Sequence, residues 1–140
     1  MVAFQRGYDE SLAHRLFGGG DLLLMPSRFE PCGLAQMQAM RYGTLPVVTD
    51  VGGLHDTVVD LDADPARGTG IVAAEVSAAG VVDALHRAGR MLADRERRDS
   101  ARLRGMTADW SWQEPALEHV RHYERLVGSR PPAAMREGTA

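Results

Sequence analysis

Short apolar runs and amphipathic stretches alternate along the first half of the chain. Residues 22–25 form an uninterrupted apolar run, a pattern typical of a strand buried on both faces of a parallel sheet. A second run covers residues 46–49 and a shorter one residues 71–73. Val2 and Phe4 alternate with polar neighbours and predict the end of a further strand, which leads us to expect that an upstream portion is missing.

Stretches with an apolar side chain every three or four positions predict helices between and after the strands. These helices follow Asp9, cover residues 33–42 and 54–59, and follow Ser77 and Ser111. Gly43 is placed to end the second helix in the left-handed conformation. The order strand, helix, strand, helix, strand predicts an α/β fold, a Rossmann-like parallel sheet with flanking helices on both faces.

Two later segments have compositions of their own. Residues 94–104 hold five Arg and three acidic side chains with little apolar periodicity, which favours a solvated helix face over a patch that binds phosphate or glucan. From Gly128 onward the chain is rich in Pro, Gly, Ser and Ala, as a frayed tail would be. We therefore expect one partial domain over residues 1–127 and a disordered tail over residues 128–140.

Composition narrows the class of protein. A chain of 140 residues with 44% hydrophobic side chains fits one domain with its own core. No run approaches the ~20 apolar residues that span a bilayer, and the first ten residues lack the layout of a secretory signal. We expect a cytoplasmic protein with no membrane partner. The formal net charge of -3 argues against nucleic acid as a partner.

Side-chain chemistry excludes several kinds of site. Cys32 is the only cysteine, so neither an internal disulfide nor a cysteine-held zinc stabilises the fold. All 16 basic residues are Arg, which excludes a Schiff-base lysine and a Walker-type phosphate lysine within this chain. His119 and His122 lie three positions apart in the last helix, but the pattern offers them no third ligand. We expect no metal and no other cofactor.

Two loops are expected where an open parallel sheet binds its ligands, beyond the carboxyl ends of the strands. Residues 27–33 follow one buried strand and residues 50–53 follow the next. The amides of Cys32, Gly33 and Leu34 open the helix after the first loop, and free N–H groups at such a place suit an anion such as a diphosphate.

Glu30, in the first of these loops, admits two interpretations. An acid just before a helix is favourable for the helix dipole without any function. At the ligand rim, a carboxylate can instead hydrogen-bond a sugar or stabilise positive charge at an anomeric carbon. No second carboxylate lies nearby in sequence to complete an acid/base pair. Cys32 is better explained as a small packing residue than as a nucleophile, because no His stands in a supporting motif.

Residues of this region closely resemble the C-terminal domain of bacterial glycogen synthases and plant starch synthases. The matching segments are residues 26–34, residues 41–48, and residues 52–54 together with 56–58. Residues 7–10, with His14 and Arg15, precede them and residues 110–113 follow them in the order found in the family. The resemblance covers about residues 2–127 and is most specific in the first half.

This resemblance implies a place in a GT-B enzyme, in which two Rossmann-like domains face each other across a cleft. The family transfers glucose from ADP-glucose to the non-reducing end of an α-1,4-glucan, with retention of the anomeric configuration and without a metal. Glu30 would then be a catalytic residue, the acidic side chain of the family's Glu-x7-Glu region, placed near the donor glucose. The amides of Cys32, Gly33 and Leu34 would bind the glucose hydroxyls and the diphosphate. Tyr8 would stack on the adenine; the alternative is a half-buried packing residue.

Three departures from the family pattern affect what the resemblance implies. Gln38 stands where the wider superfamily has a second Glu, which favours the glycogen synthase branch, and Ala35 stands where the family usually has Thr. The family's Lys-Thr-Gly-Gly-Leu motif and acceptor-side domain have no counterpart in this chain. We expect a truncated C-terminal portion that is inactive alone and whose partner is the missing N-terminal domain. The alternatives are another retaining GT-B enzyme that uses UDP-glucose, or a non-catalytic nucleotide-binding remnant.

Overall fold

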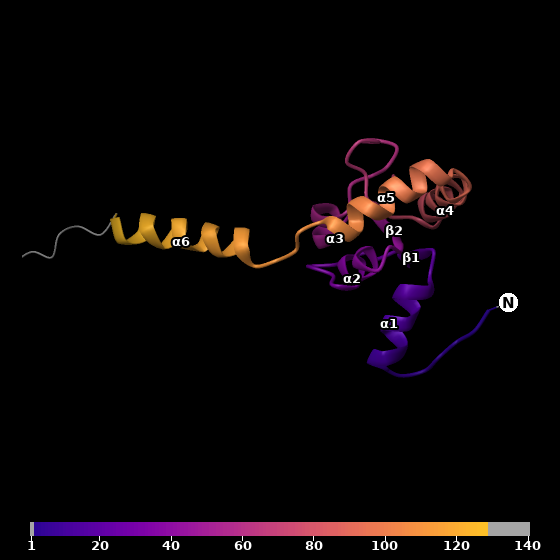
Figure 1. The fold of residues 1–140 in the computed structure, drawn as a ribbon, viewed down its shortest axis with the longest axis horizontal. Coiled ribbons are helices and arrows are strands. Elements are labelled where there is room, and N and C mark those ends of the chain that lie inside the picture. The colour runs from indigo at the N-terminus through magenta and orange to yellow at the C-terminus, as the bar shows by residue number, and fades with distance from the viewer. Residues whose placement is uncertain (1, 129–140) are drawn as a thin grey trace, which may run out of the picture. The chain divides into compact units, whose positions relative to one another are not determined.

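The computed structural model describes residues 2–128, which fall into two units, residues 2–108 and residues 109–128 (Figure 1). The first unit contains three parallel strands in the order β1-β2-β3. They are β1 (Leu22–Met25), β2 (Leu45–Thr49) and β3 (Ile71–Ala73). The α/β fold with a Rossmann-like parallel sheet is therefore confirmed, and each strand lies where an apolar run predicts it.

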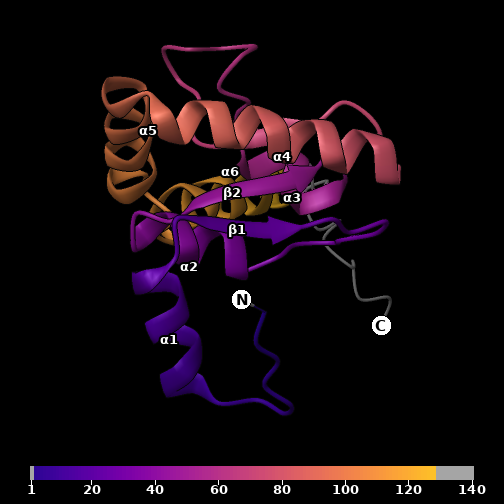
Figure 2. The ribbon, with the colours of Figure 1, turned by 90° about the vertical axis from the view of Figure 1, so that its right-hand side faces the viewer.

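Five helices accompany these strands: α1 (Glu10–Gly19), α2 (Ala35–Arg41), α3 (Gly52–Thr57), α4 (Ala78–Ala93) and α5 (Arg95–Thr107). Figure 2 shows α4 above the strands and α1 and α2 below them. Successive side chains of a strand point to opposite faces, so β2 supplies two apolar clusters. Val47 packs with residues of α4 and α5, whereas Val48 packs with Leu54 of α3. Helices therefore cover both faces, as predicted.

Side-chain caps and one glycine fix the ends of three helices. The Asp9 carboxylate accepts a hydrogen bond from the Leu12 amide at 2.9 Å, and the Ser77 hydroxyl accepts one from the Gly80 amide at 3.0 Å. Gly43, just past α2, has φ +83°, a left-handed conformation that favours glycine. Asp9 and Ser77, which the predicted helices follow, are thus the N-caps of α1 and α4, and the predicted stop at Gly43 is confirmed.

Two expectations about the strands are wrong. Residues 2–8 form no strand, and Val2 and Phe4 are 99% and 88% exposed. A strand forms only when its backbone pairs with a neighbour, and in the described part of the chain nothing pairs with the outer edge of β1. Because β1 is an edge strand, it is also not buried on both faces: the side chain of Leu24 is 42% exposed.

The arginine-rich segment forms α5, and its basic side chains are not simply solvated. Arg97 binds the Asp62 carboxylate and the Leu61 carbonyl oxygen. Arg104 donates to the Gly68 carbonyl oxygen at 2.8 Å, and Arg102 lies 2.7 Å from an oxygen of Asp21. The expected solvated face is thus wrong for these three arginines, because residues 61–68 and Asp21 fold back onto them.

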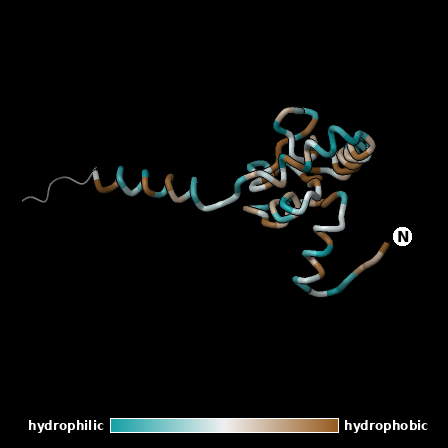
Figure 3. Tube along the Cα trace, viewed as in Figure 1, coloured by the Kyte–Doolittle hydropathy of each residue, from teal (hydrophilic) through white to brown (hydrophobic). Residues whose placement is uncertain are grey.

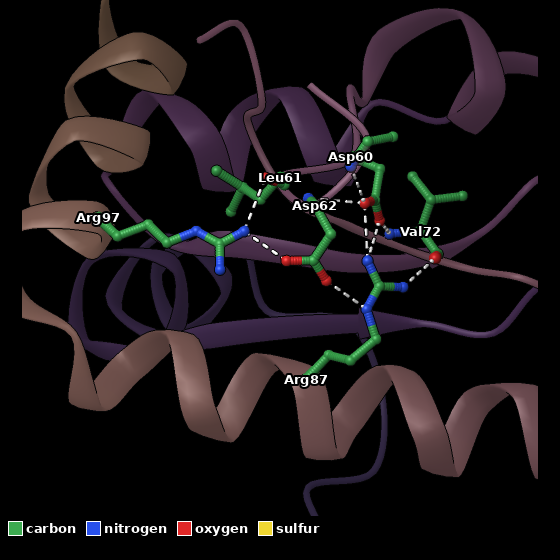
Figure 4. A network of polar contacts seen from close by, with 7 residues as sticks. Asp60, Leu61, Asp62, Val72, Arg87 and Arg97 are labelled. Carbon is green, nitrogen blue, oxygen red and sulfur yellow. Dashed lines mark hydrogen bonds and ion pairs between the residues drawn. The ribbon is translucent and has the colours of Figure 1, made fainter. Parts of the chain in front are cut away.

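A partly buried ion-pair network fixes the loop before β3 (Figure 4). Arg87 of α4 lies 2.7 Å from both carboxylate oxygens of Asp60, and it donates to the Val72 carbonyl oxygen at 2.9 Å. Asp62 accepts from both Arg87 and Arg97. Burial alone would raise the pKa of Asp60, but hydrogen bonds from the Val72 amide and from Arg87 outweigh it and lower that pKa. Hydrogen bonds from Arg97 and Arg87 lower the pKa of Asp62.

The second unit contains α6 (Gln113–Gly128), along which apolar and polar positions alternate in bands (Figure 3). Pro115 is tolerated because it is the third residue of the helix, where an N–H has no intrahelical acceptor. The Ser111 hydroxyl, which precedes the helix, accepts a hydrogen bond from the Gln113 amide at 3.4 Å. No helix among the described residues is long and apolar enough to cross a membrane. The expected frayed tail, apart from Gly128, lies outside the described residues.

Candidate functional site

The two loops predicted to share the ligand rim are in contact. Residues 27–33 leave β1 and residues 50–53 leave β2, and both lie beyond the carboxyl ends of adjacent parallel strands. The Gly53 amide donates to the Glu30 carbonyl oxygen at 2.9 Å. The Thr49 hydroxyl, at the end of β2, donates to the Ser27 carbonyl oxygen at 2.5 Å. Hydrogen bonds therefore attach the start of the first loop to the end of β2 and its middle to the second loop.

Close approach of these backbones requires the paired glycines. A Cβ on Gly52 would lie 2.0 Å from the Glu30 carbonyl oxygen, and one on Gly53 would lie 1.8 Å from that of Cys32. Both distances are far below van der Waals contact. Gly52 also has φ +44°, which side chains rarely adopt. Gly52 and Gly53 thus allow the two loops to touch.

Gln36 of α2 is a residue of the site that sequence reasoning missed. Its side chain is fully buried, and its amide nitrogen lies 2.7 Å from the Gly33 carbonyl oxygen and 3.2 Å from that of Cys32. The same nitrogen lies 3.1 Å from the Thr57 hydroxyl, which donates to the Gly53 carbonyl oxygen at 2.5 Å. A polar residue on the inner side of a helix, three positions after a loop glycine, is the signal that would have found it.

The amides predicted to receive an anion have no protein acceptor. Among the described residues, the N–H groups of Cys32, Gly33 and Leu34 donate no hydrogen bond, and no side chain caps the start of α2. Cys32 and Leu34 are exposed, and Gly33 has φ +72°. These three adjacent donors lie at the sheet's carboxyl edge without a protein acceptor, and their binding of an anion stays a prediction.

Glu30 precedes these amides in the first loop and contacts the second loop through its backbone. Its backbone carbonyl is held by Gly53, but within residues 2–128 its half-buried carboxylate has no hydrogen-bond or ion-pair partner. The carboxylate therefore makes no capping hydrogen bond to α2, whose N-cap is Leu34. A carboxylate without a structural partner at the rim is free to interact with a bound molecule.

The structure does not bring Tyr8 together with the loop amides. Tyr8 precedes α1, and no hydrogen bond or ring contact joins it to residues 27–34 within the described chain. Its side chain is 87% exposed, which rules out the alternative of a half-buried packing residue in this structure. An exposed ring leaves one or both aromatic faces open.

Two further features border the site. The His55 Nδ1 atom lies 2.6 Å from an Asp50 carboxylate oxygen, and this hydrogen bond, with the charge of Asp50, raises the pKa of His55. An open groove of about 370 Å³ lies between the ends of β1 and β2 and the start of α4, and Arg28 lines it. Among the described residues, no cluster of three or more His, Cys, Asp or Glu side chains is arranged to hold a metal ion.

Comparison with known proteins identifies relatives of the whole first unit. The model of the family "Glycosyl transferases group 1" matches residues 2–104. Glycogen synthase of Halorhodospira halophila is 48% identical over 124 residues, which are 89% of this chain and 26% of that enzyme. Glycogen synthase of Anaeromyxobacter dehalogenans strain 2CP-C is 50% identical over 126 residues, 90% of this chain and 26% of that enzyme. The chain therefore spans about a quarter of these curated relatives.

Solved structures give the same picture of the fold. The catalytic domain of starch synthase IV from Arabidopsis thaliana, bound to ADP and acarbose, superposes with a TM-score of 0.78 and 36% identity, covering 87% of this chain and 26% of that one. Sucrose-phosphate synthase from Thermosynechococcus elongatus superposes with a TM-score of 0.61 and 28% identity, covering 92% of this chain and 31% of that one. Both the matched family and the fold lead to one conclusion: the chain belongs to the group 1 glycosyl transferases, with the sheet and helices of a GT-B catalytic domain.

Proposed function

We propose that this chain is the donor-binding C-terminal part of a glycogen or starch synthase, an enzyme that transfers glucose to an α-1,4-glucan. The observation that carries the proposal is the row of unpartnered amides at Cys32, Gly33 and Leu34 beside the unpartnered Glu30 carboxylate. Free N–H groups suit the two phosphates of a nucleotide-sugar donor, and a carboxylate suits its sugar. The identity to curated glycogen synthases supports the same reading.

In the proposed reaction, the bond between the anomeric carbon and the diphosphate oxygen breaks, and a glucan hydroxyl attacks the same face of the sugar. The departing diphosphate oxygen takes the proton of that hydroxyl, so retention needs no second protein carboxylate. Glu30 would stabilise the positive charge that develops at the anomeric carbon. The amides of Cys32, Gly33 and Leu34 would stabilise the negative charge that develops on the leaving diphosphate.

ADP-glucose is the donor we propose, with the adenine stacked on the exposed ring of Tyr8. The structure of the relative from Arabidopsis thaliana was solved with ADP and acarbose bound. This supports the proposal that enzymes of this type bind a nucleoside diphosphate and a glucan-like sugar. UDP-glucose is the alternative donor. Titration of the 140-residue chain with ADP and with UDP, followed by the amide NMR signals of residues 32–34, tests the site and separates the two. Absence of any shift with either nucleotide contradicts the proposal.

We propose that catalysis needs a second domain, because transfer requires donor and acceptor to be held together. The chain alone is then inactive, and its partners are ADP-glucose, an α-1,4-glucan and the N-terminal domain of the same enzyme. A chimera tests this: residues 2–127 replace the matching segment of the Halorhodospira halophila glycogen synthase. Glucan synthesis by the chimera supports a competent donor half, whereas an inactive, folded chimera favours a non-catalytic nucleotide-binding remnant. A cytoplasmic location stays a prediction.

A further inference from the structure

Gln36 holds two consecutive peptide groups of the loop from one side. Its amide nitrogen lies within hydrogen-bond distance of the carbonyl oxygens of Cys32 and Gly33, at 3.2 and 2.7 Å. Those carbonyls belong to the peptide groups whose N–H donors are on Gly33 and Leu34. A side chain that is fully buried makes both contacts from inside the protein.

Because the peptide groups are trans, these contacts to the carbonyl oxygens also determine where the N–H bonds of Gly33 and Leu34 point. In a trans peptide, the C=O and N–H bonds lie in one plane and point in opposite directions. Because no peptide bond among the described residues is cis, holding the two carbonyls toward the interior points the N–H groups of Gly33 and Leu34 away from it. Among the described residues these two N–H groups have no acceptor, which agrees with an outward orientation.

Burying the Gln36 side chain in this arrangement is unfavourable for the free energy of folding. Its carbonyl oxygen Oε1 is buried and has no hydrogen-bond partner among the described residues. Unsatisfied buried polar atoms are rare in proteins and concentrate where function requires them. A Cβ on Gly33 would lie 2.6 Å from that oxygen, so glycine at position 33 is what lets the Gln36 amide reach the loop.

Thr57 connects Gln36 to the second loop. Its hydroxyl lies 3.1 Å from the Gln36 amide nitrogen and donates to the Gly53 carbonyl oxygen. The Gly53 amide in turn binds the Glu30 carbonyl oxygen at 2.9 Å. One chain of hydrogen bonds therefore runs from the backbone of Glu30 to the peptide groups of residues 32–34.

We propose that Gln36 is a positioning residue that aims the Gly33 and Leu34 amides at the diphosphate of the donor and fixes them relative to Glu30. This inference rests on the proposed function for its ligand, but the orientation of the two N–H bonds is a property of the unliganded chain. The two claims therefore need separate measurements.

Residual dipolar couplings and relaxation of the Gly33 and Leu34 N–H bonds, measured on the isotope-labelled 140-residue chain, test the orientation. In the unsubstituted chain both bonds should be as ordered as a rigid backbone, with order parameters of about 0.85. In Gln36→Met, which keeps the length of the side chain but removes its donors, the couplings should change and the order parameters should fall below about 0.6. Unchanged couplings and order in Gln36→Met overturn the inference.

Gln38→Met is the matched control, because Gln38 lies two positions along the same helix with an exposed side chain. It should leave both N–H bonds unchanged, and an equal effect of the two substitutions would overturn the inference. Persistent amide protection in β2 establishes that Gln36→Met is folded. If Gln36→Met does not fold, Thr57→Val replaces it. This substitution keeps Gln36 but removes the hydroxyl that contacts its amide nitrogen, and unchanged couplings at Gly33 then overturn the inference.

Titration with ADP separates this inference from the proposed function. The unsubstituted chain should bind ADP with shifts at Gly33 and Leu34, and Gln36→Met should bind it about 10-fold more weakly. A chain whose N–H bonds are fixed by Gln36 but which does not respond to ADP contradicts the proposed function and leaves the orientation intact. Full ADP affinity in Gln36→Met, with disordered N–H bonds, overturns their role in binding the diphosphate.

Discussion

The Gly53 amide donates a hydrogen bond to the carbonyl oxygen of Glu30 at 2.9 Å, joining loops that leave two adjacent strands. This bond can form only because the backbones approach without an intervening side chain. A Cβ at position 53 would lie 1.8 Å from the Cys32 carbonyl oxygen, a distance that no rotamer change relieves, because both groups are backbone or attached directly to it. The position of Glu30 thus depends on Gly53, which has no side chain that could bind a ligand or take part in a reaction.

Gly53→Ala should therefore separate the loops and destabilise the chain by about 1–3 kcal/mol, the typical range for steric overlap that the backbone must relieve. Chemical denaturation followed by circular dichroism measures this. Gly89→Ala is the control, because a Cβ at position 89 of α4 meets nothing within 4 Å. That substitution should stabilise the chain by about 0.5–1 kcal/mol. Equal effects from the two variants would contradict the account of the loop contact.

The network of Asp60, Asp62 and Arg87 predicts a loss of stability in acid. Hydrogen bonds lower the folded-state pKa of both carboxyls, so their contribution is present above the unfolded pKa of about 3.9. It is lost as pH falls from that value through the lowered folded-state pKa. Denaturation midpoints measured between about pH 5 and pH 2 should fall steeply in the unsubstituted chain and less steeply in Asp60→Asn.

Removing the cation of this network should lower the free energy of unfolding at neutral pH. Arg87→Met leaves the Asp60 carboxylate, whose side chain is 14% exposed, without its cationic partner and should lower the free energy of unfolding by about 3 kcal/mol. Arg90→Met, on an exposed position of the same helix, should change it by less than about 0.5 kcal/mol. A loss of stability in Arg90→Met that matched Arg87→Met would show that general charge, not the network, is responsible.

Local patterns predict the elements of this fold because each depends on nearby residues. The apolar runs become β1, β2 and β3, and Asp9 caps α1 through an amide three positions away. The exception is α3, whose first turn contains the glycines 52 and 53. Those glycines suggest a turn in the sequence, but their helical start is fixed by contact with the other loop.

What the sequence does not predict are contacts between distant positions. The hydrogen bond between Gln36 and Thr57 spans 21 residues, and that between Arg87 and Asp60 spans 27. Pairing of this kind leaves no local pattern: the spacing of Gln36 from Gly33 sets it apart from the exposed Gln38, but nothing in the sequence identifies Thr57 as its partner. The exposure of Leu24 is likewise decided by the absence of a neighbouring strand among the described residues rather than by the run around it.

Glu30→Gln in the chimeric glycogen synthase should lower kcat by at least ~100-fold, because the amide cannot stabilise positive charge at the anomeric carbon. The affinity for donor should change much less. Steady-state kinetics with ADP-glucose and glycogen measures both. If Glu30 serves only the dipole of α2, kcat should stay near that of the parent chimera and stability should fall by less than about 1 kcal/mol.

The proposed role of Tyr8 in binding adenine can be tested without a change in the stability of the fold. Its side chain is 87% exposed, so Tyr8→Ala should leave the melting temperature of the 140-residue chain almost unchanged. Stacking of a base on an aromatic ring contributes on the order of 1 to 3 kcal/mol, so the same substitution should weaken ADP binding by roughly 5- to 100-fold.

Tyr8→Phe is the matched control for stacking. It keeps the ring face and removes only the hydroxyl, so ADP affinity should remain close to that of the unsubstituted chain. Calorimetric titration with ADP beside thermal unfolding of both variants distinguishes the possibilities. Undiminished ADP affinity in Tyr8→Ala contradicts stacking, and a loss in Tyr8→Phe as large as that in Tyr8→Ala assigns the contact to the hydroxyl. Weaker binding in Tyr8→Ala alone, at an unchanged melting temperature, is the result that stacking requires, because only the ring face distinguishes the two variants.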